Sequence, residues 1–256
     1  MRFNEEREKR IMISIITVSF NDKNHLAKVL NSIMSQTYKD YENIVVDGGS
    51  TDGTVELLKE YESRMNGKMR WISEKDDGIY YAINKGIKMA RGDIIGMLYD
   101  EYADENVLRK IANAFEDTEC DAVHGDLVYM GDSKQVVRYW HMGQGDIRDG
   151  WMAGHPTLYV KSEVYHKYGL YDTRYKGGAD YDFEIRIFKD NKLKITYIPE
   201  ILVNMFYGGT STKGLSGYWR SFKEGVVSLK RNKVDHPILI SIKKTFIVLK
   251  QFRGKS

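Results

Sequence analysis

The stretch Ile44-Val45-Val46-Asp47-Gly48-Gly49-Ser50-Thr51-Asp52-Gly53-Thr54 predicts a buried strand that stops at a carboxylate, followed by a tight loop and the start of a helix. Its glycines allow positive φ and a close approach of the backbone to a ligand. Open α/β sheets hold ligands at strand ends of this kind, so Asp47 is a candidate acceptor of hydrogen bonds from a sugar hydroxyl or a base N–H. The alternative is an ordinary strand-to-helix turn, because Asp-Gly and Ser-Thr-Asp are common in loops.

Strand and helix patterns alternate four times around this stretch. The expected strands cover residues 11–20, 41–47, 68–73 and 93–98, and the expected helices cover 23–36, 54–64, 79–90 and 104–115, with Asp104 as the cap of the last. This alternation indicates a parallel sheet built from strand–helix–strand units. Right-handed crossovers place the carboxyl ends of such strands along one edge. We therefore expect residues 17–21, Asp47, the pair at 76–77 and Asp100 to line one crevice.

The second half of the chain is less regular. We expect a hairpin over 122–130 and 135–140, strands at 157–160 and 194–198, and helices at 162–168, 179–189, 215–230 and 237–252. The predicted fold class is α/β, with a mostly parallel central sheet flanked by helices and a C-terminal helical extension. The predicted organisation is one domain over 1–212, with a nucleotide-binding half at 11–116 and an acceptor half at 117–212, and the extension at 213–256.

Composition narrows the class of protein. Of 256 residues, 42% are apolar and 29% are charged, as is usual for a soluble globular protein. The net charge of +3 is too small to indicate nucleic-acid binding, so no nucleic-acid partner is expected. The single cysteine, Cys120, excludes an internal disulfide and suits a reducing compartment. We see neither a signal peptide nor an apolar run long enough to span a bilayer, and we expect a cytoplasmic protein.

Seven segments, in order, resemble the family 2 glycosyltransferases with the GT-A fold, which is Rossmann-like. They are Thr-Val-Ser-Phe-Asn at 17–21, Ser-Ile-Met-Ser-Gln-Thr-Tyr at 32–38, the stretch at 45–54, Ser-Glu-Lys-Asp-Asp-Gly-Ile-Tyr at 73–80, Asn-Lys-Gly at 84–86, Gly-Asp-Ile-Ile-Gly at 92–96, and Gly-Ala-Asp-Tyr-Asp at 178–182. The resemblance implies transfer of a sugar from a nucleotide-diphosphate sugar, with UDP the commonest carrier, to an acceptor hydroxyl in polysaccharide or glycan biosynthesis. A dehydrogenase is disfavoured, because no Gly-x-Gly-x-x-Gly follows the first strand.

The resemblance also implies the donor pocket. Asp47 and Asp76 would hold the base and ribose of the nucleotide, and Thr17, Ser19 and Asn21 would line the same pocket. Asn21 has a second interpretation, as the cap of the following helix.

On the acceptor side, the resemblance assigns the catalytic base to Asp180, which would take the proton of the attacking hydroxyl so that the anomeric centre inverts. His155 would lie near the acceptor and the diphosphate, or serve as a core hydrogen-bonding residue. Asp182 would orient the acceptor or its own neighbour, and Arg186 would pair with a carboxylate inside the domain. Trp151 would either stack on acceptor sugars or pack in the core.

The metal segment departs from the family pattern. Family members use a divalent cation, Mn²⁺ or Mg²⁺, to balance charge on the leaving diphosphate. Asp100 and Glu101 are the best-placed ligands here, but residues 98–106 form a shorter segment than the family carries. A displaced carboxylate would weaken or abolish metal binding, because metal geometry tolerates little displacement. The alternative function is therefore a catalytically impaired relative that still binds a nucleotide sugar or a glycan.

The C-terminal segment 237–256 combines Ile, Leu, Phe and Val with five Lys or Arg. A basic, apolar helix of this kind can lie on an anionic membrane surface. Its alternatives are packing against the domain or against a second copy of the chain in a homodimer. In the first case the protein would work at the inner face of the plasma membrane, on a saccharide or lipid-linked saccharide acceptor.

Overall fold

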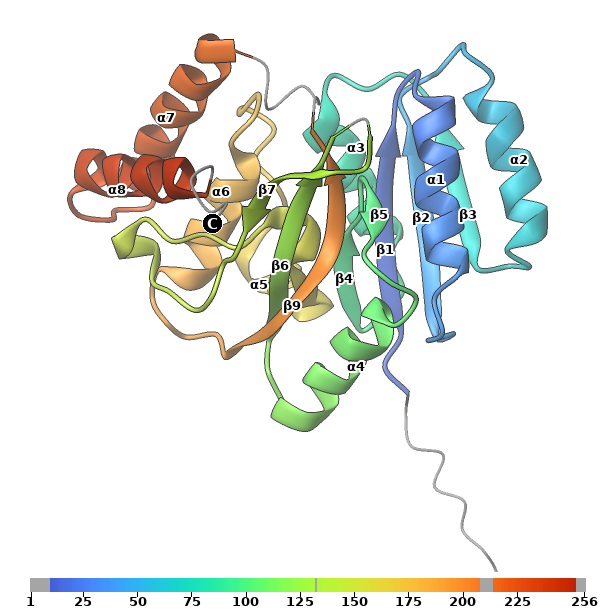
Figure 1. Cartoon of the computed structure of the whole chain (residues 1–256), viewed down its shortest axis with the longest axis horizontal. Helices are drawn as coiled ribbons and strands as arrows, with labels where there is room; N and C mark the ends of the chain where they lie inside the picture. Colours follow the sequence, from blue (N-terminus) through green and yellow to red (C-terminus); the bar gives the residue numbers. More distant parts are fainter. Residues whose placement is uncertain (1–9, 132, 208–213, 252–256) are drawn as a thin grey trace, which may run out of the picture.

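The computed structural model describes residues 10–131, 133–207 and 214–251 (Figure 1). Its strands form one sheet in the order β3-β2-β1-β4-β8-β6-β9-β5, and β7 pairs with β6. The strands are β1 (Ile13–Ser19), β2 (Tyr41–Asp47), β3 (Met69–Ser73), β4 (Ile94–Met97), β5 (Glu101–Tyr102), β6 (Ala122–Met130), β7 (Val136–Trp140), β8 (Tyr159–Lys161) and β9 (Ile195–Phe206).

The helices are α1 (Lys23–Met34), α2 (Thr54–Arg64), α3 (Ile79–Met89), α4 (Val107–Thr118), α5 (Ser162–Tyr168), α6 (Ala179–Phe188), α7 (Gly214–Arg231) and α8 (Pro237–Lys250), with short 3-10 turns η1 (Ile147–Asp149) and η2 (His155–Thr157). Strands β1, β2, β3 and β4 pair in parallel, and β9 runs parallel to β6. The antiparallel pairs among the described residues are β4 with β8, β8 with β6, β6 with β7, and β5 with β9. The predicted α/β fold with a mostly parallel sheet is confirmed.

Apolar side chains cover both faces of the sheet. Ile13 and Ile15 of β1 pack with residues of α1, α2 and α4 in one cluster. Ile16, the next residue along β1, packs with residues of α3, α5 and α6 in a second cluster. Because both faces are covered, the strands carry apolar runs such as residues 15–16 and 44–46, and these runs are why the sequence pattern identified them.

The predicted start of the fourth helix is wrong. Helix α4 begins at Val107, with Asn106 at the cap position. Asp104 does not cap it: its carboxylate accepts from the backbone N–H of Asn106 at 2.7 Å and pairs with Lys110 at 2.8 Å. The aspartate therefore closes a turn ahead of the helix, a local structure that the same residue type favours.

Strand β9 is much longer than the predicted strand at 194–198. Its pairing with β6 shifts register between Ile198↔Gly125 and Ile201↔Asp126, which leaves Pro199 and Glu200 in an irregularity. A proline cannot donate a ladder hydrogen bond, and the bulge lets the strand continue past it. The short β5, which pairs with this extended part of β9, was not predicted.

Helices α7 and α8 form a pair that packs against α6. Figure 1 shows this pair at the opposite end of the molecule from α2 and β3. Gly225 of α7 and Lys244 of α8 both lie against the ring of Tyr181 in α6. No helix within the described ranges has the length and apolar character needed to cross a bilayer.

Candidate active site

A row of polar side chains lies where three parallel strands end. Ser19 of β1 is in register with Asp47 of β2, and Asp47 is in register with Ser73 of β3. The fully buried carboxylate of Asp47 accepts from Ser73 Oγ at 2.6 Å and from Ser50 N at 2.9 Å, and also from Ser50 Oγ. Ser19 Oγ is buried and has no hydrogen-bond partner among the described residues. The structure thus brings two predicted donor-site residues together, and Asp47 also shapes the loop that follows it.

The loop after β2 is held by side chains from the end of β1. Asn21 has a φ of 50°, donates its backbone N–H to Ser50 Oγ at 2.7 Å, and accepts from Thr51 N at 2.8 Å through Oδ1. Asn21 therefore holds this loop through two hydrogen bonds, and Asp22, not Asn21, is the cap residue of α1. Thr17 lies deeper, buried beneath the row, where its hydroxyl accepts from Asn43 at 3.1 Å.

Helix α3 connects the donor row to the acceptor half. Lys85 pairs with Asp76 at 2.7 Å, and Tyr80, one and a half turns earlier in α3, donates to the carboxylate of Asp180 at 3.5 Å. Gly86 allows α3 to lie directly on β1, since a Cβ there would be 2.4 Å from a methyl group of Ile16. One rigid helix therefore contacts a predicted donor residue and the predicted base.

Asp180 lies in the first turn of α6, half-buried, beside a group of aromatic rings. His155 Nε2 is 3.0 Å from the Tyr99 hydroxyl, and its ring meets that of Tyr171 at 5.5 Å. Tyr171 in turn stacks on Tyr80 at 6.0 Å. Burial lowers the pKa of His155, against the opposing effect of the Asp180 charge, so the imidazole is neutral at pH 7.

Two further ionisable groups near Asp180 escaped prediction. Glu184 is fully buried, accepts from Ala153 N at 2.9 Å through Oε2, and has a pKa raised well above its usual value, mainly by burial and further by Asp180. Lys244 of α8 lies with Nζ 3.5 Å from the centre of the Tyr181 ring, and burial lowers its pKa. Nothing in the sequence near Asp180 indicates the lysine, because it comes from the far C-terminal helix.

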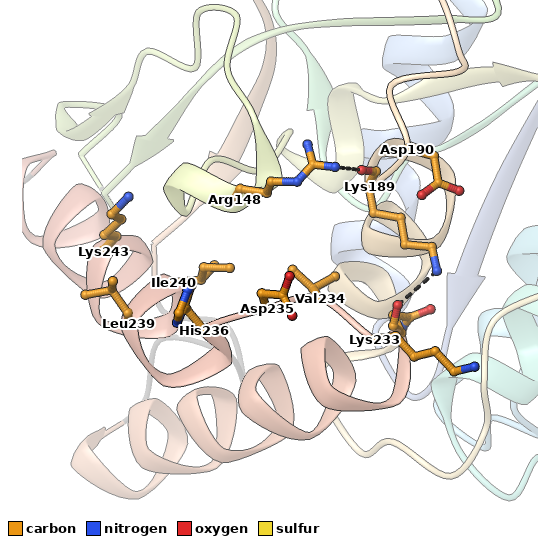
Figure 2. A pocket seen from close by; sticks show the side chains of 11 residues that line it. Arg148, Lys189, Asp190, Lys233, Val234, Asp235, His236, Leu239, Ile240 and Lys243 are labelled. Carbon is orange, nitrogen blue, oxygen red and sulfur yellow. Dashed lines mark hydrogen bonds between the residues drawn. The ribbon is translucent and has the colours of Figure 1, made fainter.

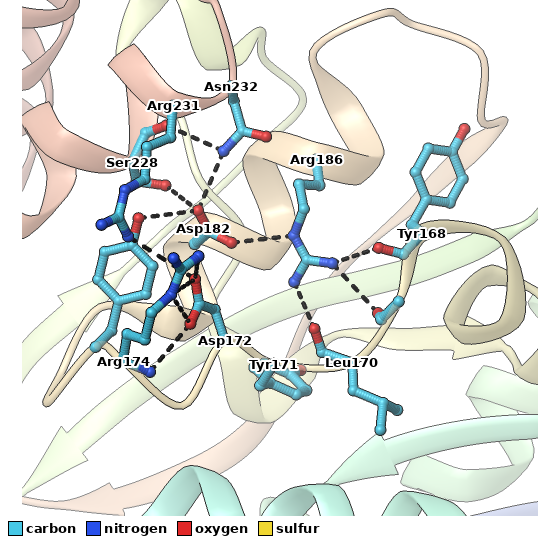
Figure 3. A network of polar contacts seen from close by, with 12 residues as sticks. Tyr168, Leu170, Tyr171, Asp172, Arg174, Asp182, Arg186, Ser228, Arg231 and Asn232 are labelled. Atoms are coloured by element: carbon cyan, nitrogen blue, oxygen red, sulfur yellow. Dashed lines mark hydrogen bonds and ion pairs between the residues drawn. The ribbon is translucent and has the colours of Figure 1, made fainter.

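Asp182 is the centre of a network that joins α6 to α7 (Figure 3). Its Oδ1 accepts from Ser228 at 2.6 Å, Asn232 at 3.1 Å and Tyr175 at 3.2 Å, and its Oδ2 accepts from Arg186 at 3.0 Å. Arg186 pairs with an internal carboxylate, as the sequence predicted. Because both oxygens of Asp182 have protein partners and the side chain is buried, the contacts favour the alternative in which it orients its neighbours.

Trp151 packs in the core. It is 8% exposed, donates from Nε1 to the carbonyl of Met142 at 3.1 Å, and contacts the rings of His124 and Phe188. These contacts favour the packing interpretation of Trp151 over an acceptor platform.

The predicted metal ligands do not form a metal cage. Asp100 Oδ1 lies 3.1 Å from His25 Nε2 and accepts from Phe206 N at 3.1 Å. The hydrogen bond with Asp100 raises the pKa of His25 to about 9, so at neutral pH a cation from the protein already faces this carboxylate. Glu101 in β5 is exposed. Across residues 10–131, 133–207 and 214–251, no group of three or more His, Cys, Asp or Glu is arranged to hold a metal ion.

Comparison with known proteins identifies the family. The family model described as glycosyl transferase family 2 matches residues 14–189. A PGL/p-HBAD biosynthesis glycosyltransferase of Mycobacterium bovis is 27% identical over 204 residues, which cover 78% of this chain and 79% of the relative. The glycosyltransferase GlyA of Streptococcus pneumoniae is 28% identical over 131 residues, 51% of this chain and 18% of that one.

Solved structures share the fold at low sequence identity. S. aureus TarS 1–349, in complex with UDP-GlcNAc, has a TM-score of 0.70 at 15% identity over 96% of this chain and 74% of that one. The mannosyltransferase PcManGT from Pyrobaculum calidifontis, in complex with GDP-Man and Mn²⁺, has a TM-score of 0.64 at 14% identity over 97% of this chain and 77% of that one. Since the family model covers more than half of the residues and the sheet and helices match, this chain is a glycosyltransferase that belongs to family 2.

Proposed function

We propose that the chain transfers a sugar from a nucleotide-diphosphate sugar, a UDP-sugar, to a hydroxyl of a glycan or lipid-linked acceptor in polysaccharide or glycan biosynthesis. The observation that carries this proposal is the placement of Asp180. Its carboxylate lies at the start of α6 and accepts a hydrogen bond from Tyr80 of α3, the same helix whose Lys85 pairs with the predicted donor residue Asp76. A carboxylate beside a ligand-binding sheet edge is suited to removing a proton from an acceptor hydroxyl.

The proposed donor site consists of residues at or near the ends of β1, β2 and β3: Thr17, Ser19, Asn21, Asp47 and Asp76. Ser19 Oγ, buried without a partner among the described residues, has a hydrogen bond left to offer a ligand. Relatives of the same fold bind UDP-GlcNAc in TarS and GDP-Man in PcManGT, which supports a nucleotide-sugar donor for this chain.

In the proposed reaction, the acceptor oxygen attacks the anomeric carbon while the bond from that carbon to the diphosphate breaks. The hydroxyl proton passes to the carboxylate of Asp180, and the nucleoside diphosphate leaves from the opposite face, which inverts the anomeric centre. Tyr80 fixes Asp180 from α3. His155, neutral and bonded to Tyr99, adds no positive charge that would lower the basicity of the carboxylate.

A panel of nucleotide sugars tests the proposal in two stages. Thermal shift with each donor, with and without Mn²⁺, identifies the donor, because a ligand that binds only the folded state raises the melting temperature. Transfer and donor hydrolysis are then measured for wild type, Asp180→Asn and the control Asp117→Asn, which makes the same chemical change at an exposed site on α4. We expect Asp180→Asn to lose roughly 10²- to 10⁴-fold in turnover with donor binding retained.

Two results would contradict the proposal. Equal turnover of wild type and Asp180→Asn would remove Asp180 from the role of base. Donor binding by wild type without turnover of any donor would favour the alternative, a relative that binds a nucleotide sugar without catalysis. The contact of His25 with Asp100, the predicted metal ligand, gives that alternative its structural basis.

A further inference from the structure

The outward face of α8 is apolar, which is unusual for a helix at the surface of a domain. Phe246 is 60% exposed, Ile238 55%, and Leu239 and Leu249 each 53%, and Ile242 is also exposed. Surface helices normally turn charged and polar residues to solvent. Five large apolar side chains on one exposed face therefore mark an interaction surface.

Helical geometry shows that these residues share a face. At 3.6 residues per turn, Ile240, Ser241, Lys244 and Val248 fall on one side of α8, and this side is the one buried or half-buried against the domain. The five exposed apolar residues fall on the opposite side. The helix thus has a small inner face that fixes it to α6 and η1 and a larger apolar face that stays exposed.

The apolar surface continues onto α7. A groove of about 480 Å³ runs between α7 and α8 and is lined by Trp219 and Phe222 from α7 and by Ile242, Phe246 and Leu249 from α8. Trp219 is 60% exposed and stacks on Phe222 at a ring distance of 5.8 Å. We call these residues, together with Ile238 and Leu239, the apolar face of the α7–α8 pair.

Basic residues flank the apolar face on its other side. A pocket of about 580 Å³ is lined by Arg148, Lys189, Lys233, His236 and Lys243, and also by Leu239 of the apolar face (Figure 2). Two acidic residues, Asp190 and Asp235, line the same pocket. Over residues 214–251 the sequence has eight Lys or Arg and two Asp or Glu, whereas the full chain has 39 and 36. Positive charge is thus concentrated on the α7–α8 pair.

We propose that the α7–α8 pair docks on an anionic membrane surface, with α8 lying in the plane of the interface and Trp219, Ile242 and Phe246 inserted among the lipids. An exposed apolar stripe bordered by lysines, with an aromatic residue at its edge, is the pattern of helices that lie in a membrane interface. A second copy fits less well, because a two-fold interface would bring two equally basic surfaces together. Anionic lipid head groups complement the charge instead.

The α7–α8 pair contacts the segment that carries the proposed catalytic base, so its position also indicates the kind of acceptor. This step rests on the proposed function. Glu224 of α7 accepts from the backbone N–H groups of Lys176 and Gly177 at 3.3 and 3.1 Å, and this loop leads directly to Asp180. Lys244 of α8 contacts Tyr181, the residue after Asp180. A pair of helices held in the interface would present Asp180 to a hydroxyl near the membrane, which favours an acceptor carried on a lipid.

Vesicle sedimentation tests the docking without any donor or turnover. The full chain is mixed with vesicles of phosphatidylcholine alone or with phosphatidylglycerol added, and the bound fraction is measured. The test variant is Ile242→Ser/Phe246→Ser, and the matched control is Val136→Ser/Phe206→Ser, which removes two comparably exposed apolar side chains from β7 and β9. We expect wild type and control to bind the anionic vesicles and the test variant to bind at least tenfold more weakly.

Two further readouts separate the possible outcomes. Tryptophan emission should shift to shorter wavelength on anionic vesicles in wild type but not in Trp219→Phe, which keeps the other three tryptophans. Asp180→Asn should bind as wild type does, so a failure of catalysis does not affect the result. The proposal would be overturned if wild type did not bind anionic vesicles, or if the test variant bound them as well as wild type does. A wild-type dimer in gel filtration that Ile242→Ser/Phe246→Ser converts to a monomer would also overturn it, because the apolar face would then belong to a second copy.

Discussion

Replacing Asp182 by asparagine tests whether this residue supports the fold or binds the acceptor. In the structure its carboxylate joins α6 to α7 through Ser228 and Asn232 and pairs with Arg186 within α6 (Figure 3). Asparagine keeps one oxygen that can accept from Ser228 and Asn232. Its NH₂ group would face the Nε–H of Arg186, and because both groups are donors, no hydrogen bond forms between them. The change removes the contact with Arg186 from a buried site, and this one contact is both a charge-assisted hydrogen bond and an ion pair.

The magnitude follows from what Arg186 retains. Its guanidinium still donates to the carbonyl of Leu170 at 2.7 Å and to those of Tyr168 and Gly169, so it is not left unpaired. The loss therefore lies between that of a hydrogen bond to a charged group and that of a broken buried ion pair. We expect the free energy of unfolding to fall by about 2–4 kcal/mol.

Urea denaturation at pH 7 measures this change, with Asp172→Asn as the control. Asp172 pairs with Arg174, whose side chain is 70% exposed, and we expect that substitution to lower the free energy of unfolding by less than about 1 kcal/mol. For folded Asp182→Asn we expect an acceptor KM close to that of wild type. A change in stability below about 1 kcal/mol together with a raised acceptor KM would refute the supporting role and return Asp182 to the acceptor site.

Two more predictions concern His124 and His25. Burial lowers the pKa of His124 to about 4, against the opposing charge of Asp126, so protonation favours the unfolded chain as the pH falls below about 6.5, the usual histidine value. From pH 7 to 4.5 we expect wild type to lose about 2–3 kcal/mol more stability than His124→Phe in urea unfolding, and parallel pH profiles would contradict this. His25 faces Asp100, so we expect Mn²⁺ to raise the melting temperature with UDP more in His25→Gln than in wild type; an equal effect would show that His25 does not compete with a cation.

The first half of the fold was predictable because its signals are local. The strand patterns ending at Ser19 and Asp47 are rich in apolar, β-branched residues, and loop residues such as Asn, Asp and Gly follow them. Parallel connections then determine that these ends meet, and the observed register aligns Ser19, Asp47 and Ser73. The course of β9 could not be predicted in this way, because a bulge opposite β6 decides it and Pro199 suggests a strand end.

Part of the candidate site was likewise predictable from local motifs, and part depends on contacts between residues that are distant in the chain. The motif around Asp180 is visible in the sequence, and so is Arg186, four residues after the carboxylate it pairs with. The occupation of Asp100 by His25 is not visible, because the two residues lie 75 positions apart and meet only when α1 packs beside the end of β4. The contact of Lys244 with the Tyr181 ring is also not visible in the sequence, because it forms only when α8 packs against α6.

The sequence by itself determined the α/β class, the strand ends that carry polar residues, and the family, since periodicity and short motifs are properties of neighbouring residues. Only the tertiary structure decided which carboxylates remain available: Asp180 stays half-buried at a helix start, whereas Asp182 and Asp100 are engaged by partners distant in the chain. The physical reason is that the chemistry of a carboxylate depends on the charges, donors and solvent within a few ångströms of it. Long-range packing, which leaves no local mark in the sequence, sets those surroundings.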